Sequence, residues 1–237
     1  MTAPEATTSG SKGRKRGGPL RIDRTRIIDV AKKFDPQTLT MQAVADELGV
    51  DRKALNYHVT DRDTLLRLVA EEAFESAFAD AFAGYFTLDK GGADTIDWRD
   101  ALRAWAVAVR DSMVATGVLV TYFRINNDSL AIFEPIELVL RRLHDAGFDE
   151  TSAGRAVIFA THFAMAVGRD ILMQQQFGSH PQSAEVLNLL AKDDGTNGYE
   201  GIRGLVSAGL NSPADIGTQF DYELDVFIRG LERSLCA

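Results

Sequence analysis

The sequence of 237 residues contains a single cysteine, Cys236. One thiol cannot form a disulfide within the chain, which excludes a small secreted fold held together by disulfides. The chain also lacks a signal-peptide pattern and any uninterrupted apolar run of about 18 residues, the length that spans a bilayer. We therefore expect a soluble cytoplasmic protein with no membrane partner.

Patterns that carry catalysis or bind metals are missing as well. The sequence shows no Gly-rich phosphate loop, no Cys/His metal spacing and no nucleophile elbow. Histidine is scarce, with four in the chain, and only His162 falls on an otherwise apolar helix. We therefore expect no enzyme, no cofactor and no metal site. No segment alternates as a half-buried strand does, so the pattern predicts an all-α fold.

The charge is unevenly distributed along the chain. The net charge of −8 argues at first against a nucleic-acid partner. Residues 1–70, however, hold 13 Lys and Arg against 9 Asp and Glu, which gives +4, while the remainder carries −12. A basic head on an acidic body favours one orientation on DNA, because the head is attracted to phosphates and the body is repelled.

Segment 40–59, TMQAVADELGVDRKALNYHV, predicts two short helices joined by a tight turn. Thr40 and Asp51 stand where N-caps would, and Gly49 can end the first helix in the left-handed conformation. In the second helix, Leu55 and Val59, four residues apart, are the apolar positions expected to face inward. Its hydrogen-bonding side chains are Arg52, Lys53, Asn56, Tyr57 and His58. This pattern is typical of a helix-turn-helix whose second helix enters the DNA major groove, although two amphipathic helices around a glycine can also be plain packing.

The part GVDRKALNYHV resembles the recognition segment of the TetR (tetracycline-repressor) family. That segment commonly has Gly-Val, variable residues, Leu, an aromatic residue, His and an aliphatic or aromatic residue. Two departures are Ala54, where the family often has Thr, and Asn56, where it often has Tyr. The match continues into the next helix. The residues that we expect to contact DNA are Thr40, Arg52, Lys53, Ala54, Asn56, Tyr57, His58 and Arg62.

Three regions follow from this interpretation. Residues 1–19 form a basic arm that we expect to be disordered, either a solubilising tail or an arm for the minor groove. Residues 20–66 form a three-helix helix-turn-helix DNA-binding domain. Residues 67–237 form a larger helical domain for ligand binding and dimerisation. Within it, residues 179–212 look loop-rich, with one modest helix near 184–191.

Shorter matches in the larger region resemble the ligand domain of tetracycline-repressor-type proteins. They are Trp98–Leu102, Leu143–Phe148, Ala160–Phe163 and Gly230–Glu232. The resemblance implies a homodimer built through a four-helix bundle from residues 149–177 and 213–235 of each chain. Small and apolar faces on both predicted helices agree with an isologous interface.

An aromatic stripe with a four-residue repeat begins at Phe74 and predicts one face of a long helix. Large, adaptable side chains from several segments could converge there on a hydrophobic or aromatic small-molecule effector, or form a solid core. The candidate lining is Phe78, Phe82, Trp105, Val109, Met113, Phe123, Phe133, Phe159, His162, Phe163 and Met173. His162 and the Trp105 indole are the expected polar handles. Aromatic residues align with the metal–tetracycline site, so we expect a neutral or weakly anionic ligand without metal.

Together these patterns predict a ligand-responsive transcriptional regulator. We expect a repressor that leaves a palindromic double-stranded DNA operator when a hydrophobic molecule binds. The alternative is a sequence-tolerant DNA-binding protein of the same fold with no effector.

Overall fold

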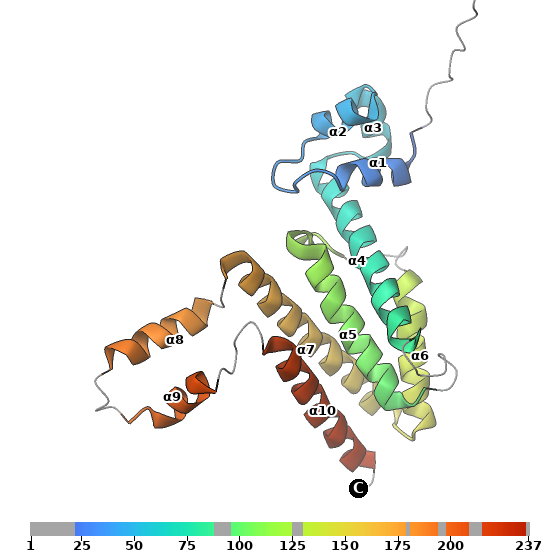
Figure 1. The fold of residues 1–237 in the computed structure, drawn as a ribbon. Helices are drawn as coiled ribbons and strands as arrows, with labels where there is room; N and C mark the ends of the chain where they lie inside the picture. The colour runs from blue at the N-terminus through green and yellow to red at the C-terminus, as the bar shows by residue number, and fades with distance from the viewer. Residues whose placement is uncertain are drawn as a thin grey trace, which may run out of the picture.

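The computed structural model describes residues 22–87, 96–124, 130–178, 181–193, 198–208 and 215–235. Within these ranges the chain is all-α, which confirms the predicted fold class, and it contains no strand (Figure 1). The elements are α1 (Arg24–Ala31), α2 (Met41–Leu48), α3 (Arg52–His58), α4 (Arg62–Thr87), α5 (Trp98–Thr116), the 3-10 helix η1 (Gly117–Thr121), α6 (Leu130–Asp145), α7 (Glu150–Phe177), α8 (Pro181–Lys192), α9 (Glu200–Ser207) and α10 (Ile216–Leu235). The predicted basic arm, residues 1–19, lies outside the described residues.

Local capping sets the bounds of α2 and α3. The Thr40 hydroxyl accepts the backbone N–H of Ala43 at 3.1 Å and so satisfies one free donor of the first turn. Gly49 ends α2 with φ of 69°, a left-handed conformation that costs glycine little. The Asp51 carboxylate then accepts the N–H of Lys53 at 2.6 Å and begins α3. The turn between the two helices is therefore specified by three residues.

Buried apolar side chains separate into two clusters. One cluster, here called the head core, lies among α1, α2, α3 and the start of α4, with Leu119 of η1 added to it. The other, the body core, lies among α4, α5, α6, α7 and α10. Helix α4 runs unbroken through both, and Figure 1 shows it as the rod between α1–α3 and the rest. The division at residue 66 therefore stays a prediction, since it falls inside a continuous helix.

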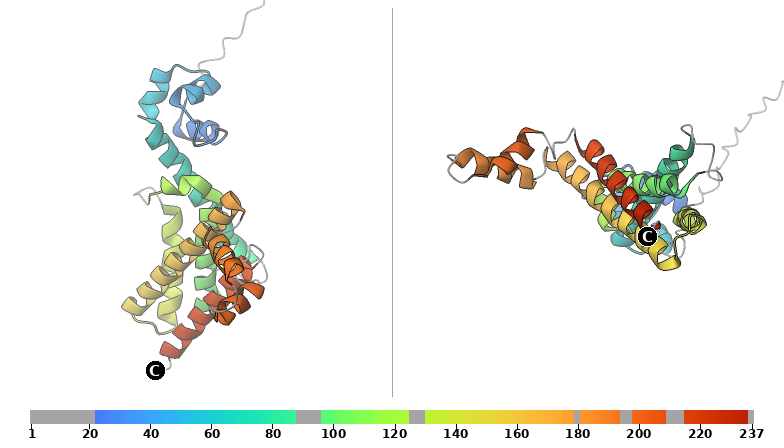
Figure 2. Two further views of the ribbon diagram at one scale, coloured as in Figure 1. Left: turned by 90° about the vertical axis from the view of Figure 1, so that its left-hand side faces the viewer. Right: turned by 90° about the horizontal axis from the view of Figure 1, so that it is seen from below.

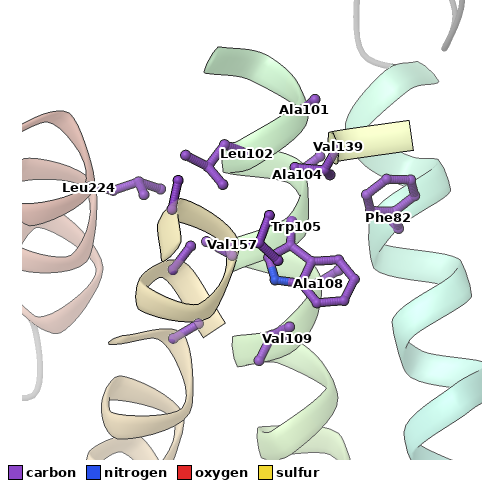
Figure 3. Close-up of a cluster of buried hydrophobic side chains, with 14 of the residues drawn as sticks. Phe82, Ala101, Leu102, Ala104, Trp105, Ala108, Val109, Val139, Val157 and Leu224 are labelled. Atoms are coloured by element: carbon purple, nitrogen blue, oxygen red, sulfur yellow. The ribbon is translucent and has the colours of Figure 1, made fainter. Parts of the chain in front are cut away.

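Helix α5 occupies the centre of the body. It packs between α4 and α7, with α6 beside it, and small residues such as Ala101, Ala104 and Ala108 allow the close approach (Figure 3). On α4 the aromatic stripe faces this helix, since the Phe78 ring meets the edge of the Trp105 ring of α5 at 5.2 Å. Burial of this apolar surface is the main stabilising contribution in the body.

Two helices are long and apolar enough to cross a membrane by length and composition alone, α5 with η1 and α7. Half of the apolar window of α5 is buried in the body core, as expected for a central helix of a globular protein. Only 28% of the window of α7 is buried. Much of its apolar surface therefore faces away from the body.

The segment after α7 differs from the sequence prediction. Residues 179–212 were expected to be loop-rich with one helix, but the structure contains two, α8 and α9. Helix α9 was missed because it holds Gly201 and Gly204, which weaken an isolated helix. Arg203 of α9 donates to the Asp193 carboxylate after α8 at 2.5 Å and joins the two helices. Figures 1 and 2 show this pair projecting from the body.

Candidate nucleic-acid interface and ligand site

Helix α3 turns almost all of its side chains to solvent. Leu55 is fully buried in the head core, and it is the one buried residue within the helix. Tyr57 is 88% exposed, an unusual state for a large aromatic side chain. The predicted contacts Arg52, Lys53, Ala54, Asn56 and His58 are exposed as well. This surface suits a helix that reads a DNA groove, because its exposed donors can exchange hydrogen bonds with water for hydrogen bonds with base edges or phosphates.

Two further predicted contacts flank this helix. Thr40 is exposed, and its hydroxyl is already used as the N-cap of α2. Arg62 begins α4, and its guanidinium points back to the loop before α2. It donates to the backbone carbonyl of Leu39 at 2.8 Å from Nε and to that of Pro36 at 2.6 Å from Nη2. The guanidinium of Arg62 is therefore bound inside the head, and its role as a phosphate contact stays a prediction.

The start of α4 carries a fixed negative charge beside α3. The Asp61 carboxylate accepts the backbone N–H of Thr64 at 2.8 Å. This bond, followed by the bond from the Thr64 hydroxyl, lowers the pKa of Asp61 below its usual range. Asp61 therefore caps α4 as an anion at neutral pH, which complements the helix dipole.

Part of the candidate ligand lining is buried in the body core around α5. Phe78, Phe82, Trp105, Val109 and Met113 are all buried in the body core. The Phe78 ring stacks on Phe82 at 5.7 Å and meets the edge of Trp105 at 5.2 Å. Figure 3 shows Phe82 on α4, Trp105 on α5, and Val109 one turn further along α5.

Phe123 joins this set from the segment after η1. Its ring stacks on Phe74 at 4.1 Å, and it packs against both cores. The interior therefore continues up to the junction with the head.

The other predicted lining residues lie elsewhere. Phe133 of α6 and His162 of α7 are exposed, and Met173 is partly exposed near the end of α7. Phe159 is 51% exposed and stacks on Phe227 of α10, and Phe163 stacks on Phe220. These positions share the helical spacing of core residues, which is why the sequence alone grouped them with the interior.

The expected polar handles are also arranged differently. The Trp105 indole N–H donates to the Thr161 hydroxyl at 2.8 Å, and that hydroxyl donates to the Val157 carbonyl at 2.7 Å. The indole is thus satisfied within the chain, whereas His162 on the next position faces out. Thr161 was missed in the sequence, where its only signal was a hydroxyl on an otherwise apolar helix.

Two hollows open near these elements. One, of about 730 Å³, is lined by Phe82 and by residues of α6 from Phe133 to Arg141. The other, of about 380 Å³, lies between α1, the loop before α2, α4 and the end of α5. The first contains two predicted lining residues, Phe82 and Phe133, and the second contains none.

Helices α7 and α10 present an outward apolar face. Its exposed large side chains are Ile158, Phe159, Met165, Tyr222 and Val226. Arg99 and Arg103 of α5 bind Glu232 and Asp225 of α10, and these ion pairs hold α10 against the body. An exposed apolar surface of this kind on a globular domain marks an interaction site.

Comparison with known proteins shows which solved structures share this fold. No protein-family model matches the chain, and no curated protein sequence matches it. Among solved structures, a possible TetR family transcriptional regulator from Streptomyces coelicolor A3(2) matches with a TM-score of 0.67 at 22% identity, over 90% of this chain and 100% of that one. The chain has the TetR fold.

Other structures with the TetR fold contain small molecules. ActR from Streptomyces coelicolor, in complex with actinorhodin, matches with a TM-score of 0.66 at 17% identity, over 91% of this chain and 99% of that chain. A TetR variant from Acinetobacter baumannii AYE, in complex with minocycline, matches with a TM-score of 0.56 at 19% identity, over 90% and 98% of the two chains. The described part of this chain has no group of three His, Cys, Asp or Glu side chains placed to hold a metal ion.

Proposed function

We propose that this chain is a cytoplasmic, homodimeric transcriptional regulator of the TetR family that releases its operator when a hydrophobic small molecule binds. The observation that carries the proposal is α3, which buries Leu55 and exposes the six of the eight predicted contacts that lie on this helix. A helix kept this polar and this exposed contributes little to the head core. Its use is the recognition of a partner, and its Arg, Lys, Asn and His side chains suit DNA.

A two-fold dimer would complete the DNA-binding unit. The apolar face of α7 and α10 is the surface that we assign to the partner subunit. Pairing through it would place two copies of α3 in successive major grooves, about 34 Å apart or a multiple of that spacing. The expected operator is therefore a pseudo-palindrome.

The effector would act through α4. The aromatic interior lies against this helix, and the larger hollow opens beside Phe82. A hydrophobic or aromatic ligand there would stabilise one position of α4 and so one spacing of the two heads. It can weaken DNA binding only by as much as it prefers the state that does not fit the operator. Solved TetR-fold proteins with actinorhodin or minocycline support such a site.

The test is selection of binding sites from random duplex DNA, followed by footprinting. We expect one protected palindrome, and we expect Asn56→Ala to cost about 1–3 kcal/mol on that site while binding to random DNA stays unchanged. Asn188→Ala, an exposed asparagine of α8, is the matched control and should leave both affinities unaltered. Uniform, low-affinity protection without a selected sequence would instead establish the sequence-tolerant binder.

A further inference from the structure

Helix α4 carries a second stripe on a face distinct from its phenylalanines. It consists of Leu66, Val69, Ala73, Ala77 and Asp80, which recur every three or four residues. Side chains near the head are large and buried, those in the middle are methyl groups, and the last is a carboxylate. The change from large to small leaves space along this face of the helix.

That space is the smaller hollow, of about 380 Å³, at the junction of head and body. The head contributes Ala31, Phe34, Pro36 and Leu39, and the body contributes Ala115 and Leu119 at the end of α5 and in η1. Figure 1 shows α1 on one side of this junction and the upper end of α5 on the other. The volume lies within the range of small-molecule sites, and most of the wall is apolar.

Charge at the rim selects the kind of ligand. Lys32 lines the hollow, but Glu72 neutralises it in an ion pair. Asp80 also lines the hollow and has no cationic partner among the residues that the structure describes. The remaining charge is therefore negative, and the body as a whole is acidic.

We propose that this junction hollow binds a small amphipathic organic cation. Its apolar part contacts Phe34, Leu39 and the α4 methyl groups, and its ammonium group pairs with Asp80. This ligand differs in charge and in place from the effector of the body interior. The site lies outside the set of residues that the sequence singled out.

An occupant would touch both parts of the molecule at once. Pro36 and Leu39 line the hollow and also supply the carbonyls that Arg62 binds. The next residue, Thr40, caps α2. Occupancy therefore restrains the head against the body, and this consequence for DNA binding rests on the proposed function.

The test uses three probes of one shape and different charge: 2-naphthylmethylamine, 2-naphthylmethanol and 2-naphthoate. Isothermal titration calorimetry on the full chain without DNA should show the amine binding most tightly and the carboxylate least tightly. Asp80→Asn should weaken the amine about fivefold, as for a solvent-exposed ion pair, and leave the alcohol unchanged. Glu75→Gln on the same helix is the control and should change neither.

Filling the hollow provides the second arm of the test. Ala77→Phe should abolish binding of the amine and the alcohol, whereas Ala83→Phe, on an exposed part of α4, should not. Equal affinity in Ala77→Phe and the unaltered chain would overturn the site, as would equal affinity for amine and carboxylate. With a selected DNA site, saturating amine should change the DNA affinity at least threefold. Unchanged affinity at full occupancy would overturn the coupling while leaving the binding site intact.

Discussion

At the scale of single residues, the guanidinium of Arg62 is bound within the head. The sequence predicts a phosphate contact, yet Nε and Nη2 are bound to carbonyls of the loop before α2. Hydrogen bonds from a charged donor contribute more than neutral ones, and these join α4 to the loop that ends at Thr40. Arg62 therefore positions the helix-turn-helix on α4.

We expect Arg62→Ala to lower the free energy of unfolding by about 1–2 kcal/mol, because three carbonyls lose their donor. Chemical denaturation measures this loss. DNA affinity should fall, but its dependence on salt should keep the same slope, since no counterion-releasing contact is removed.

Arg62→Lys separates the two roles. Lysine keeps the charge but cannot donate in a fork, so a positioning role predicts that this variant is also destabilised. If Arg62→Lys keeps full stability and Arg62→Ala reduces the salt slope by about one, the residue binds phosphate instead.

Asp149 is a second residue whose local bonds have a measurable consequence. Its carboxylate caps α7 by accepting the Ser152 hydroxyl at 2.7 Å and the N–H of Thr151 at 2.9 Å. The Ser152 hydroxyl first, and then the backbone N–H groups, lower the pKa of Asp149 below its ordinary value of 3.8. A lowered folded-state pKa adds stability above the unfolded value, and this is lost as the pH falls through the folded value.

The expected result is a pH-dependent difference between the unaltered chain and Asp149→Asn. The unaltered chain should be more stable at neutral pH, and the difference should shrink as the pH falls below about 4. Thermal denaturation followed by circular dichroism measures both curves. Ser152→Ala should move the loss to higher pH; a difference that stays constant down to acid pH would contradict the assignment.

At the scale of elements, contact between α5 and α7 depends on Gly168. A Cβ added there would lie 3.0 Å from Met113 Cβ and 3.3 Å from the Arg110 carbonyl oxygen, so one helix would have to shift. We expect Gly168→Ala to destabilise the chain by about 1 kcal/mol despite the better helix propensity of alanine. Gly154 of the same helix has open space around it. Gly154→Ala should stabilise by about 0.5–1 kcal/mol, and equal effects at both positions would refute the close approach.

The ends of a helix were predictable from the sequence where a capping residue marks them. Thr40, Gly49 and Asp51 fix α2 and α3 in the sequence as they do in the structure. The aromatic stripe that begins at Phe74 also predicted a long helix, and α4 spans Arg62–Thr87. Helix α9 was not predictable, because two glycines in eight residues outweigh a short apolar pattern. Tertiary contacts with α8, rather than its own sequence, stabilise that helix.

The candidate ligand site was only partly predictable, because periodicity does not distinguish a helix face that packs inward from one that faces a partner. Phe78 and Phe159 have similar surroundings in sequence, yet the first is fully buried and the second is half exposed. Nor does the pattern reveal a hollow made by small residues such as Ala73 and Ala77. A cavity forms where several helices together leave a volume unfilled. Its position therefore depends on three-dimensional packing and cannot be derived from the local sequence pattern.

At the scale of the whole molecule, the outward face of α7 and α10 predicts the assembly. Ala164 of α7 is fully buried, so an arginine there would disrupt the body core rather than the interface. Ile158 and Val226 are more than half exposed on this face. We expect Ile158→Arg with Val226→Arg to give folded monomers in sedimentation, because two charges would have to be buried in the interface.

Ala83→Arg, on an exposed part of α4, is the control and should remain dimeric. A double variant that stays dimeric with unchanged circular dichroism would place the interface elsewhere. The same variant also tests the operator model, since a monomer presents one α3 and should bind a half-site with much lower affinity.

The unbroken course of α4 has a mechanical consequence. Its 26 residues make a rod of roughly 39 Å, at about 1.5 Å per residue, with the head fixed near one end by Arg62 and the aromatic interior near the other. A rod of that length works as a lever. A tilt of about 5° at the body end displaces the head end by roughly 3 Å, close to the rise of one base pair. In the proposed two-fold dimer the displacements would add, so a small ligand-induced movement of the interior would put both copies of α3 out of register with the DNA grooves.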